Sequence, residues 1–291
     1  MKKITTYMLL LASIVFASCE QEILVSRDHD INAEVSELET SFEMKTLYCN
    51  LTDAASVNLD EVAAYIKAQD ADVVSLLGSG AAFESWVATY AANEGLSYAV
   101  KLLASSESVA ACLSKKEVKT YSDGFDNAVQ TSPILHFSVE DVHFLIAELK
   151  KGGLVLSDGS QTDDFNADRV AQISDIVANT VDHSAYFTAS KWVLNVDMES
   201  PATLDITKYG VESVIAENCV ANDVLASNGI IDAVAYFNNF YTPSSIDSSR
   251  HNFLYTTAKS GQMMQPLKVD TSVSAMGLHH YPIMVTLKSE E

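Results

Sequence analysis

The side chains in this chain that could do chemistry are its carboxylates, seven histidines and four cysteines, and none stands in a spacing that identifies a site by itself. No Cys-x-x-Cys or His-x-x-x-His pair is present, so a zinc site is not indicated. The stretch Gly78-Ser79-Gly80 lacks the length and the lysine of a phosphate-binding loop. A Gly-x-Ser-x-Gly nucleophile motif is also missing. Any chemistry must therefore come from residues that the fold brings together.

The apolar run at 73–77 predicts the central strand of that fold. Val-Val-Ser-Leu-Leu is too short for a helix, contains β-branched residues and is followed by glycine. In open α/β sheets, ligands collect just past the carboxyl ends of such strands. The residues at this point are Leu77, Gly78 and Ser79, which cannot hold a metal ion or transfer a proton at neutral pH. No catalytic group stands where the topology would place one.

The remaining periodicity predicts an α/β protein with mixed sheets, because early β-α-β-α units are followed by hairpins. Alternation along 142–149 predicts that Glu148 is solvent-exposed. The helices are expected at 58–68, at 81–93 before Gly95, and at 163–180. The strands are expected at 45–51, 73–77, 97–103, 109–114, 134–139, 142–149, 191–196, 252–257 and 281–287.

Composition limits the class of partner. The chain has 291 residues and is 48% hydrophobic, which suits one large domain or two small ones. It carries 18 Lys and Arg against 39 Asp and Glu, a net charge of −21. Such a field repels polyanions, so nucleic acid is disfavoured as a partner.

The first residues have the pattern of a targeting signal. Lys2-Lys3 precede an apolar stretch at 8–16 that is too short to span a membrane, and Ala17-Ser18 then precede Cys19. This pattern resembles the bacterial lipoprotein signal, which implies cleavage before Cys19 and lipidation of that residue. The protein would then be anchored outside the cytoplasm at the cell envelope, in the outer membrane or at the surface. The alternative is an ordinary secretory signal with a chance cysteine.

The expected organisation has three parts: a signal peptide at 1–18, the lipidated cysteine with a flexible tether at 19–43, and a folded domain at 44–291. Cys49, Cys112 and Cys219 remain after lipidation. An odd number of cysteines gives no complete disulfide framework, and buried free thiols are expected.

The order of short motifs resembles the endonuclease/exonuclease/phosphatase superfamily, with the deoxyribonuclease I-like fold. The superfamily's strand ending in Tyr-Asn is similar to Leu-Tyr-Cys-Asn-Leu, and its Asp-Val-Val-x-Leu-Gln-Glu strand is similar to Asp-Val-Val-Ser-Leu-Leu-Gly. The resemblance implies a four-layer sandwich, in which two mixed β-sheets pack face to face with helices outside. The similar segments are 47–51, 72–78, 111–115, 145–149, 169–172, 193–199, 231–233, 250–253 and 278–282.

This resemblance implies hydrolysis of phosphoesters with Mg²⁺-type ions, but only part of the site is retained. Asn50, Asp197 and His280 match the superfamily's catalytic positions. Other positions differ: the metal-binding Glu becomes Gly78, a His becomes Glu148, the Asn partner of Asp197 becomes Glu199, an Asp becomes Asn252, and the Asp that orients the final His becomes His279. Because site residues act as a unit, these losses predict that family-style catalysis is lost.

Three functions remain open. The first is a lipid-anchored, catalytically degenerate binding or structural domain that needs no cofactor, with the membrane and an unidentified extracytoplasmic ligand or protein as partners. The second is a divergent metal-dependent phosphoesterase using Mg²⁺ or another divalent ion. For it, Glu148, Asp197, Glu199, His279 and His280 would form a rewired site whose carboxylates and imidazoles suit transition metals. The third is a surface lipoprotein that captures glycans or nutrients.

Simpler roles are also open for two of these positions. Asn50 could hydrogen-bond neighbouring loops. His279 and His280 could be a half-buried pair at the start of a strand.

Overall fold

The apolar run predicted to be central forms β2 (Val73–Ser79), and six of its seven residues are buried in the computed structural model of the chain. It pairs in parallel with β1 (Phe42–Asn50) and antiparallel with β4 (Ser108–Ser114). The prediction of a buried central strand is therefore confirmed. The strand continues through Gly78, so this glycine lies within the sheet.

The structure describes residues 42–52, 56–103, 108–121, 134–149, 155–157, 160–162, 171–172, 174, 176, 191–197, 230–234, 252–257, 262–264, 268–270 and 276–289. Phe42–Ser289 form one compact unit. The signal peptide, Cys19, the tether up to Ser41, Glu199 and Cys219 lie outside the described residues, as does most of the helix expected at 163–180. The last two residues of the expected tether, Phe42 and Glu43, already belong to β1. None of the described helices is long and apolar enough to span a membrane.

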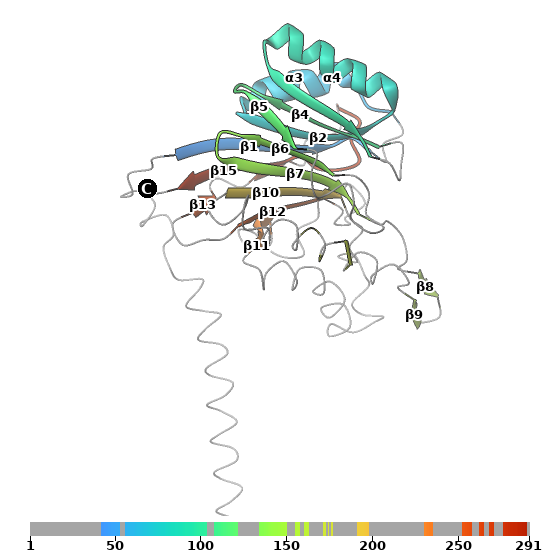
Figure 1. Cartoon of the computed structure of the whole chain (residues 1–291). Coiled ribbons are helices and arrows are strands. Elements are labelled where there is room, and N and C mark those ends of the chain that lie inside the picture. The colour runs from blue at the N-terminus through green and yellow to red at the C-terminus, as the bar shows by residue number, and fades with distance from the viewer. Residues whose placement is uncertain are drawn as a thin grey trace, which may run out of the picture. The chain divides into compact units, whose positions relative to one another are not determined.

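The first sheet has the strand order β13-β15-β1-β2-β4-β3, and β14 also pairs with β15 (Figure 1). Its only parallel pair in the described residues joins β1 to β2, so the sheet is mixed. The other strands are β3 (Ser97–Leu102), β13 (Gln262–Met264), β14 (Lys268–Val269) and β15 (Ile283–Ser289).

The second sheet is also mixed and has the order β11-β12-β10-β7-β6-β5. Its parallel pair joins β7 to β10, and the predicted hairpin of β6 and β7 turns at Glu140, whose φ is 55°. The strands are β5 (Val118–Tyr121), β6 (Leu135–Val139), β7 (Val142–Glu148), β10 (Lys191–Asp197), β11 (Ile230–Asp232) and β12 (Asn252–Thr257). A separate hairpin is formed by β8 (Val155–Ser157) and β9 (Ser160–Thr162).

Two helices cover the outer face of the first sheet (Figure 1). Helix α3 (Leu59–Gln69) begins where the side chain of Asn58 accepts a hydrogen bond from the backbone N–H of Glu61 at 3.3 Å. Helix α4 (Gly80–Glu94) ends at Gly95, whose φ of 68° is readily adopted only by glycine. Both helices are present where the sequence predicted them.

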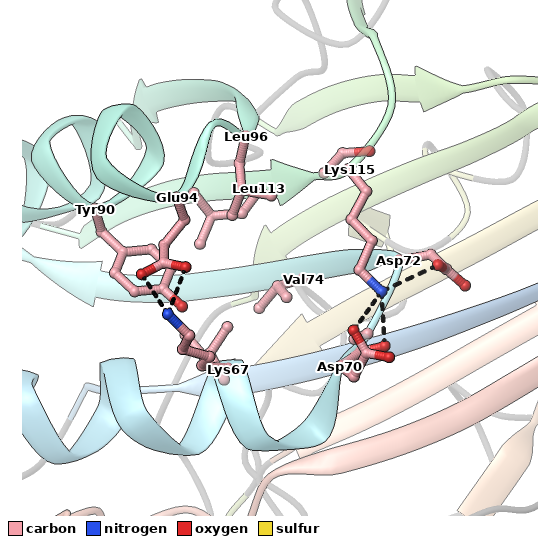
Figure 2. Close-up of a pocket in the computed structure, with 12 residues that line it drawn as sticks. Lys67, Asp70, Asp72, Val74, Tyr90, Glu94, Leu96, Leu113 and Lys115 are labelled. Carbon is pink, nitrogen blue, oxygen red and sulfur yellow. Dashed lines mark hydrogen bonds and ion pairs between the residues drawn. The ribbon is translucent and has the colours of Figure 1, made fainter.

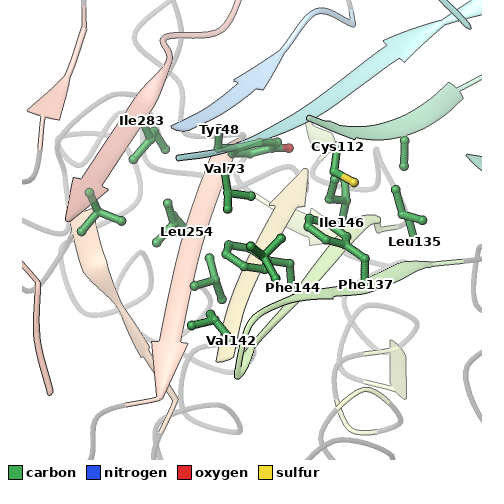
Figure 3. Packing of buried hydrophobic residues seen from close by; sticks show 14 of the residues in the cluster. Tyr48, Val73, Cys112, Leu135, Phe137, Val142, Phe144, Ile146, Leu254 and Ile283 are labelled. Atoms are coloured by element: carbon green, nitrogen blue, oxygen red, sulfur yellow. The ribbon is translucent and has the colours of Figure 1, made fainter. Parts of the chain in front are cut away.

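The main core lies between the two sheets (Figure 3). Tyr48 and Val73 come from the first sheet, whereas Phe137 and Phe144 come from the second and stack with ring centroids 5.0 Å apart. A polar contact joins the two sheets within this core: Nδ2 of Asn195 donates to Oγ of Ser75 at 2.9 Å, and both residues are buried. The expected face-to-face arrangement of two mixed sheets is therefore confirmed.

The two cysteines that the structure describes lie in this fold as expected. Cys49 on β1 and Cys112 on β4 are both buried and free. They face opposite sides of the first sheet, since Cys49 packs with α3 and α4 while Cys112 packs in the core between the sheets.

Candidate functional site

Polar residues gather where parallel strands end. Asn50 is the last residue of β1, Glu148 the last of β7 and Asp197 the last of β10. Because β7 and β10 are parallel, Glu148 and Asp197 stand opposite each other in the register. Asn252, at the start of antiparallel β12, is the register partner of Asp197 on its other side. The topology thus brings together residues that are up to about two hundred positions apart in the chain.

Three of these side chains and that of Thr52 form a buried hydrogen-bonded group that joins the two sheets. We call it the strand-end network: Asn50, Thr52, Asp197 and Asn252. Nδ2 of Asn50 donates to Oδ1 of Asn252 at 2.9 Å. The backbone N–H and the hydroxyl of Thr52 both donate to Oδ1 of Asn50, at 2.9 and 2.7 Å. The Thr52 hydroxyl also lies 3.4 Å from Oδ2 of Asp197. The expectation that Asn50 bonds a neighbouring loop is therefore confirmed.

The histidine pair lies beside this network. His280 is fully buried and His279 is half-buried, with their rings edge to face and 4.9 Å apart. Nδ2 of Asn252 lies 3.5 Å from the carbonyl oxygen of Tyr281, the residue after His280, so the segment before β15 is held next to the network. The three residues that the motif resemblance matched to catalytic positions, Asn50, Asp197 and His280, are all fully buried.

Glu148 is buried, with 8% of its surface exposed, so the prediction that it faces solvent is wrong. Alternation failed because every residue of β7 is covered: one face packs in the core between the sheets and the other in the apolar cluster that contains Trp192. Burial, followed by the charges of Asp197 and Glu148, raises the pKa of the nearby Tyr48 phenol well above its usual value. The hydroxyl of Tyr48 has no hydrogen-bond partner among the described residues.

An aromatic ring closes the space beside Gly78, the residue that the motif resemblance matched to the superfamily's metal-binding Glu. A Cβ atom added at Gly78 would lie 2.7 Å from two atoms of the Phe83 ring, which is closer than real side chains approach. Phe83 belongs to α4, is 4% exposed and stacks near Trp86 with ring centroids 5.9 Å apart. The ring therefore cannot move away without disturbing the packing of α4 on the sheet.

The residues present do not fit a Mg²⁺-type ion in the manner that the fold implies. Hard cations need several oxygen ligands with free lone pairs. Gly78 supplies none, and both lone pairs of the Asn50 side-chain oxygen are used by Thr52. Within the described part of the chain, no three His, Cys, Asp or Glu side chains are grouped as a metal site would require. Glu199 lies outside that part, so the predicted set of Glu148, Asp197, Glu199 and His279 stays a prediction.

Solved structures with the same architecture include an endonuclease and a 3′ phosphatase. An AP endonuclease from Archaeoglobus fulgidus aligns with a TM-score of 0.59 at 12% identity, over 83% of this chain and 98% of that one. The 3′ phosphatase NExo from Neisseria aligns with a TM-score of 0.60 at 14% identity, over 83% and 98%. TDP2 from Caenorhabditis elegans aligns with a TM-score of 0.54 at 16% identity, over 86% and 99%.

The chain therefore has the deoxyribonuclease I-like fold of the endonuclease/exonuclease/phosphatase superfamily, as the resemblance of its motifs implied. Identities this low establish the fold and not the activity. No family model matches the sequence, and no curated protein does.

Sequence reasoning missed Thr52 and Phe83. Thr52 follows Asn50 by two residues, which is the spacing at which an Asn side chain accepts a hydrogen bond from the backbone. The signal for Phe83 was Gly78 itself, since a glycine inside a strand often marks a place where another group approaches closely. That group could not be identified from the sequence alone.

Proposed function

We propose that this protein is a catalytically degenerate member of the deoxyribonuclease I-like fold that serves as a binding or structural domain at the bacterial cell envelope. The observation that carries the proposal is the contact between Gly78 and Phe83, because an acid cannot be placed at position 78 while the ring is there. A polar catalytic position has thus become part of the apolar packing between β2 and α4.

The strand-end network supports the same conclusion. An active site keeps polar groups available for substrate, whereas Asn50 uses its side-chain oxygen and one amide hydrogen within the protein. Asn50, Asp197 and Asn252 each have no exposed surface. This arrangement suits residues that hold two sheets together, and it leaves the retained Asn50 without the lone pairs needed for a ligand.

The test is a metal titration of the purified full chain in detergent. Melting temperature and hydrolysis of p-nitrophenyl phosphate and bis-p-nitrophenyl phosphate are measured with Mg²⁺, Mn²⁺ and Zn²⁺. We expect no metal-dependent stabilisation and no turnover above that of Asp197→Ala and His280→Ala controls. Metal-dependent turnover that both substitutions abolish would overturn the proposal.

A gain-of-function variant sharpens this test. Gly78→Glu combined with Phe83→Ala restores the acid and removes the ring that blocks it. We expect Mg²⁺ or Mn²⁺ to raise the melting temperature of this double variant. The control is Gly78→Gln with Phe83→Ala, which has the same shape without the charge, and we expect no such rise for it. A native chain that binds the ion as well as the double variant does would show that the site never lost its function.

The alternative is a divergent phosphoesterase. It is favoured by the retention of Asn50, Asp197 and His280 at the strand ends and by neighbours whose names include an endonuclease and a 3′ phosphatase. If the chain is active, hydrolysis of a phosphoester is the expected reaction. The assay above separates the two functions.

We also propose that Cys19 carries a lipid that anchors the protein outside the cytoplasm, based on the basic, apolar and small-residue pattern that precedes it. Labelling with a fatty-acid analogue in a bacterial host should mark the native chain and not Cys19→Ala, and the variant should leave the membrane fraction. Equal labelling of both chains would contradict the anchor. The envelope ligand is unassigned, and binding on a glycan array would favour the capture function.

A further inference from the structure

Strand β3 is an edge strand of the first sheet, and among the described residues it pairs only with β4. Two of its side chains are well exposed: Tyr98 at 48% and Leu102 at 63%. They are the exposed large hydrophobic residues in the part of the chain that the structure describes. An edge strand that exposes apolar side chains is a surface that another strand can cover.

The two exposed side chains lie on the same face of β3. The register partners of Tyr98 and Leu102 on β4 pack beneath helices α3 and α4, as does Val100 between them. Ala99 instead packs against the core between the two sheets. Lys101 shares the face of Ala99, because alternate residues of a strand point to opposite faces. The face of β3 on the helix side therefore carries no charge.

The backbone of β3 also presents hydrogen-bonding groups at the edge of the sheet. Just after β3, the N–H of Leu103 donates to the carbonyl oxygen of Ser108 on β4 at 2.8 Å. In an antiparallel pair every second residue bonds to the neighbouring strand, and here these are the odd-numbered residues. The N–H and C=O groups of Tyr98, Val100 and Leu102 therefore point away from β4.

A second copy of β3 is complementary to this edge. Two copies that pair antiparallel about a two-fold axis at Val100 place Tyr98 of each copy opposite Leu102 of the other. Outward N–H groups then meet outward C=O groups, and side chains stay on their own face, because opposite residues are both even-numbered. A shift by one residue breaks both conditions. Ala99 stands opposite Lys101 of the second copy, so like charges are not directly opposed.

Helix α4, which packs on β3 and β4, leaves room for this second copy. One flank of α4 faces α3: the Tyr90 hydroxyl donates to a backbone carbonyl of α3 at 3.3 Å, and Glu94 pairs with Lys67 (Figure 2). Ala88 and Ala92 lie about 160° from Tyr90 around the helix, on the flank away from α3. Their small side chains allow the α4 helices of two copies to approach to about 8–10 Å.

We propose that β3 is a dimerisation edge, at which a second copy of this chain continues the first sheet through an antiparallel pair of β3 strands centred on Val100. The pairing of Tyr98 with Leu102 favours a second copy over an unrelated strand, because each exposed residue covers the other. This interface does not depend on whether the strand-end network is catalytic.

The size of the interface sets the strength of the dimer. The paired strands and the adjoining flanks of α4 form a face about 20 Å long and about 20 Å deep. Such a face buries on the order of 1,000 Å² in total, which is at the lower limit for a specific interface. The dimer is therefore reversible, and its population depends on protein concentration.

Analytical ultracentrifugation of the purified full chain tests the proposal, with detergent micelles in large excess so that two chains do not share a micelle by chance. We expect a monomer–dimer equilibrium with a Kd of roughly 10–100 μM. Salt raised from about 0.05 to about 0.5 M should strengthen the dimer, because it screens the repulsion between chains of net charge −21. A chain that stays monomeric up to about 1 mM would overturn the proposal and leave the edge to a strand of another protein.

The register is tested by substitutions of the two exposed residues. Tyr98→Lys with Leu102→Lys places like charges opposite each other and should raise the Kd at least about tenfold. Tyr98→Lys with Leu102→Glu places opposite charges there in both halves, so its Kd should be lower than that of the first double variant. Equal Kd values for these two double variants would overturn the proposal.

The matched control is Ala64→Lys with Ala68→Lys, which adds the same charge to exposed positions of α3. Its Kd should not rise above that of the native chain, and a tenfold rise would overturn the proposal. Melting temperatures of all variants are compared with that of the native chain, because substitutions of exposed side chains should leave the fold intact.

Discussion

Phe83 of α4 occupies the space into which a side chain at Gly78 of β2 would point. Its ring atoms lie 2.7 Å from the Cβ position at residue 78, and both residues belong to well-packed elements. The ring of Phe83 therefore leaves no room for a side chain at position 78. This pair links the residue permitted at position 78 to the packing of helix α4 on the sheet.

The first prediction concerns this pair. Gly78→Ala should lower the free energy of unfolding by about 1–3 kcal/mol, because the new methyl group overlaps the Phe83 ring. In a Phe83→Leu background the same substitution should cost less, giving a coupling of about 0.5–3 kcal/mol in a double-mutant cycle. Urea denaturation of the native chain, the two single variants and the double variant gives the four free energies of unfolding. Additive effects would show that ring and glycine are not in contact.

The second prediction concerns the strand-end network. Asn50→Ala should destabilise the fold by about 1–3 kcal/mol, because it removes the acceptor of two Thr52 hydrogen bonds and the donor of the bond to Asn252. In a working enzyme, removal of a site residue is often neutral or stabilising. A rise in melting temperature for Asn50→Ala would therefore count against a structural role and for a catalytic one.

The third prediction concerns the hydrogen bond between Asn195 and Ser75, which crosses the core between the sheets. Ser75→Ala leaves the amide of Asn195 buried with one partner fewer, which should cost about 1–3 kcal/mol. Adding Asn195→Leu also removes the buried amide that has lost its partner, and it should restore much of the lost free energy of unfolding. Chemical denaturation of the single and double variants checks it, and a double variant no more stable than Ser75→Ala would contradict this account.

The fourth prediction concerns pH. Burial lowers the pKa of His143, although Asp141 acts in the opposite direction. Nε2 of His136 lies 2.9 Å from Nδ1 of His143, and this bond needs one of the two nitrogens unprotonated. The unfolded chain, with a histidine pKa of about 6.5, then binds the proton more tightly than the folded chain. Stability should therefore decrease as the pH falls below about 6.5, until the folded-state pKa is passed.

Melting temperatures measured from about pH 7 to pH 5 test this dependence. His143→Gln should flatten the decrease, since it removes the titrating ring. Asp141→Asn should extend the decrease to lower pH, because the charge that raises the pKa of His143 is gone. A pH profile of His143→Gln identical to that of the native chain would rule out this residue as the cause.

The fifth prediction concerns the thiols. Burial raises the pKa of Cys112 to about 12, and burial, followed by the charge of Asp270, raises the pKa of Cys49 well above its usual value. Neither should react with a thiol reagent near pH 8 while the protein is folded, because the thiolate is the reactive form. In a Cys219→Ser chain with Cys19 lipidated, both should react in denaturant. Rapid labelling of the folded chain would mean that the sheets open on the timescale of the reaction.

The order of the elements followed from local patterns. The run at 73–77 became a buried central strand, Asn58 capped α3, and Gly95 ended α4. These features depend on a few neighbouring residues, whose side chains and backbone preferences act over one or two turns of chain. The colinear motifs also indicated the two-sheet architecture, which structures from Archaeoglobus fulgidus and Neisseria share.

Local patterns did not predict which residues of the candidate site are buried or which side chains they bond. Alternation predicted an exposed Glu148, but the residue is buried because both faces of β7 are covered by other parts of the chain. The partner of Asn50 on β12 is 202 positions away, and nothing near either residue indicates the contact. Such pairs are set by strand order and register.

The sequence by itself determined the acidic charge, the longer strands and two helices, and the absence of an acid at position 78, because these are properties of the residues and their neighbours. Only the tertiary structure decided that Phe83 fills the space beside Gly78 and that the side chain of Asn50 is bonded within the protein. These features arise from packing between segments that are distant in the chain, where the partner of a side chain is fixed by the fold and not by its neighbours.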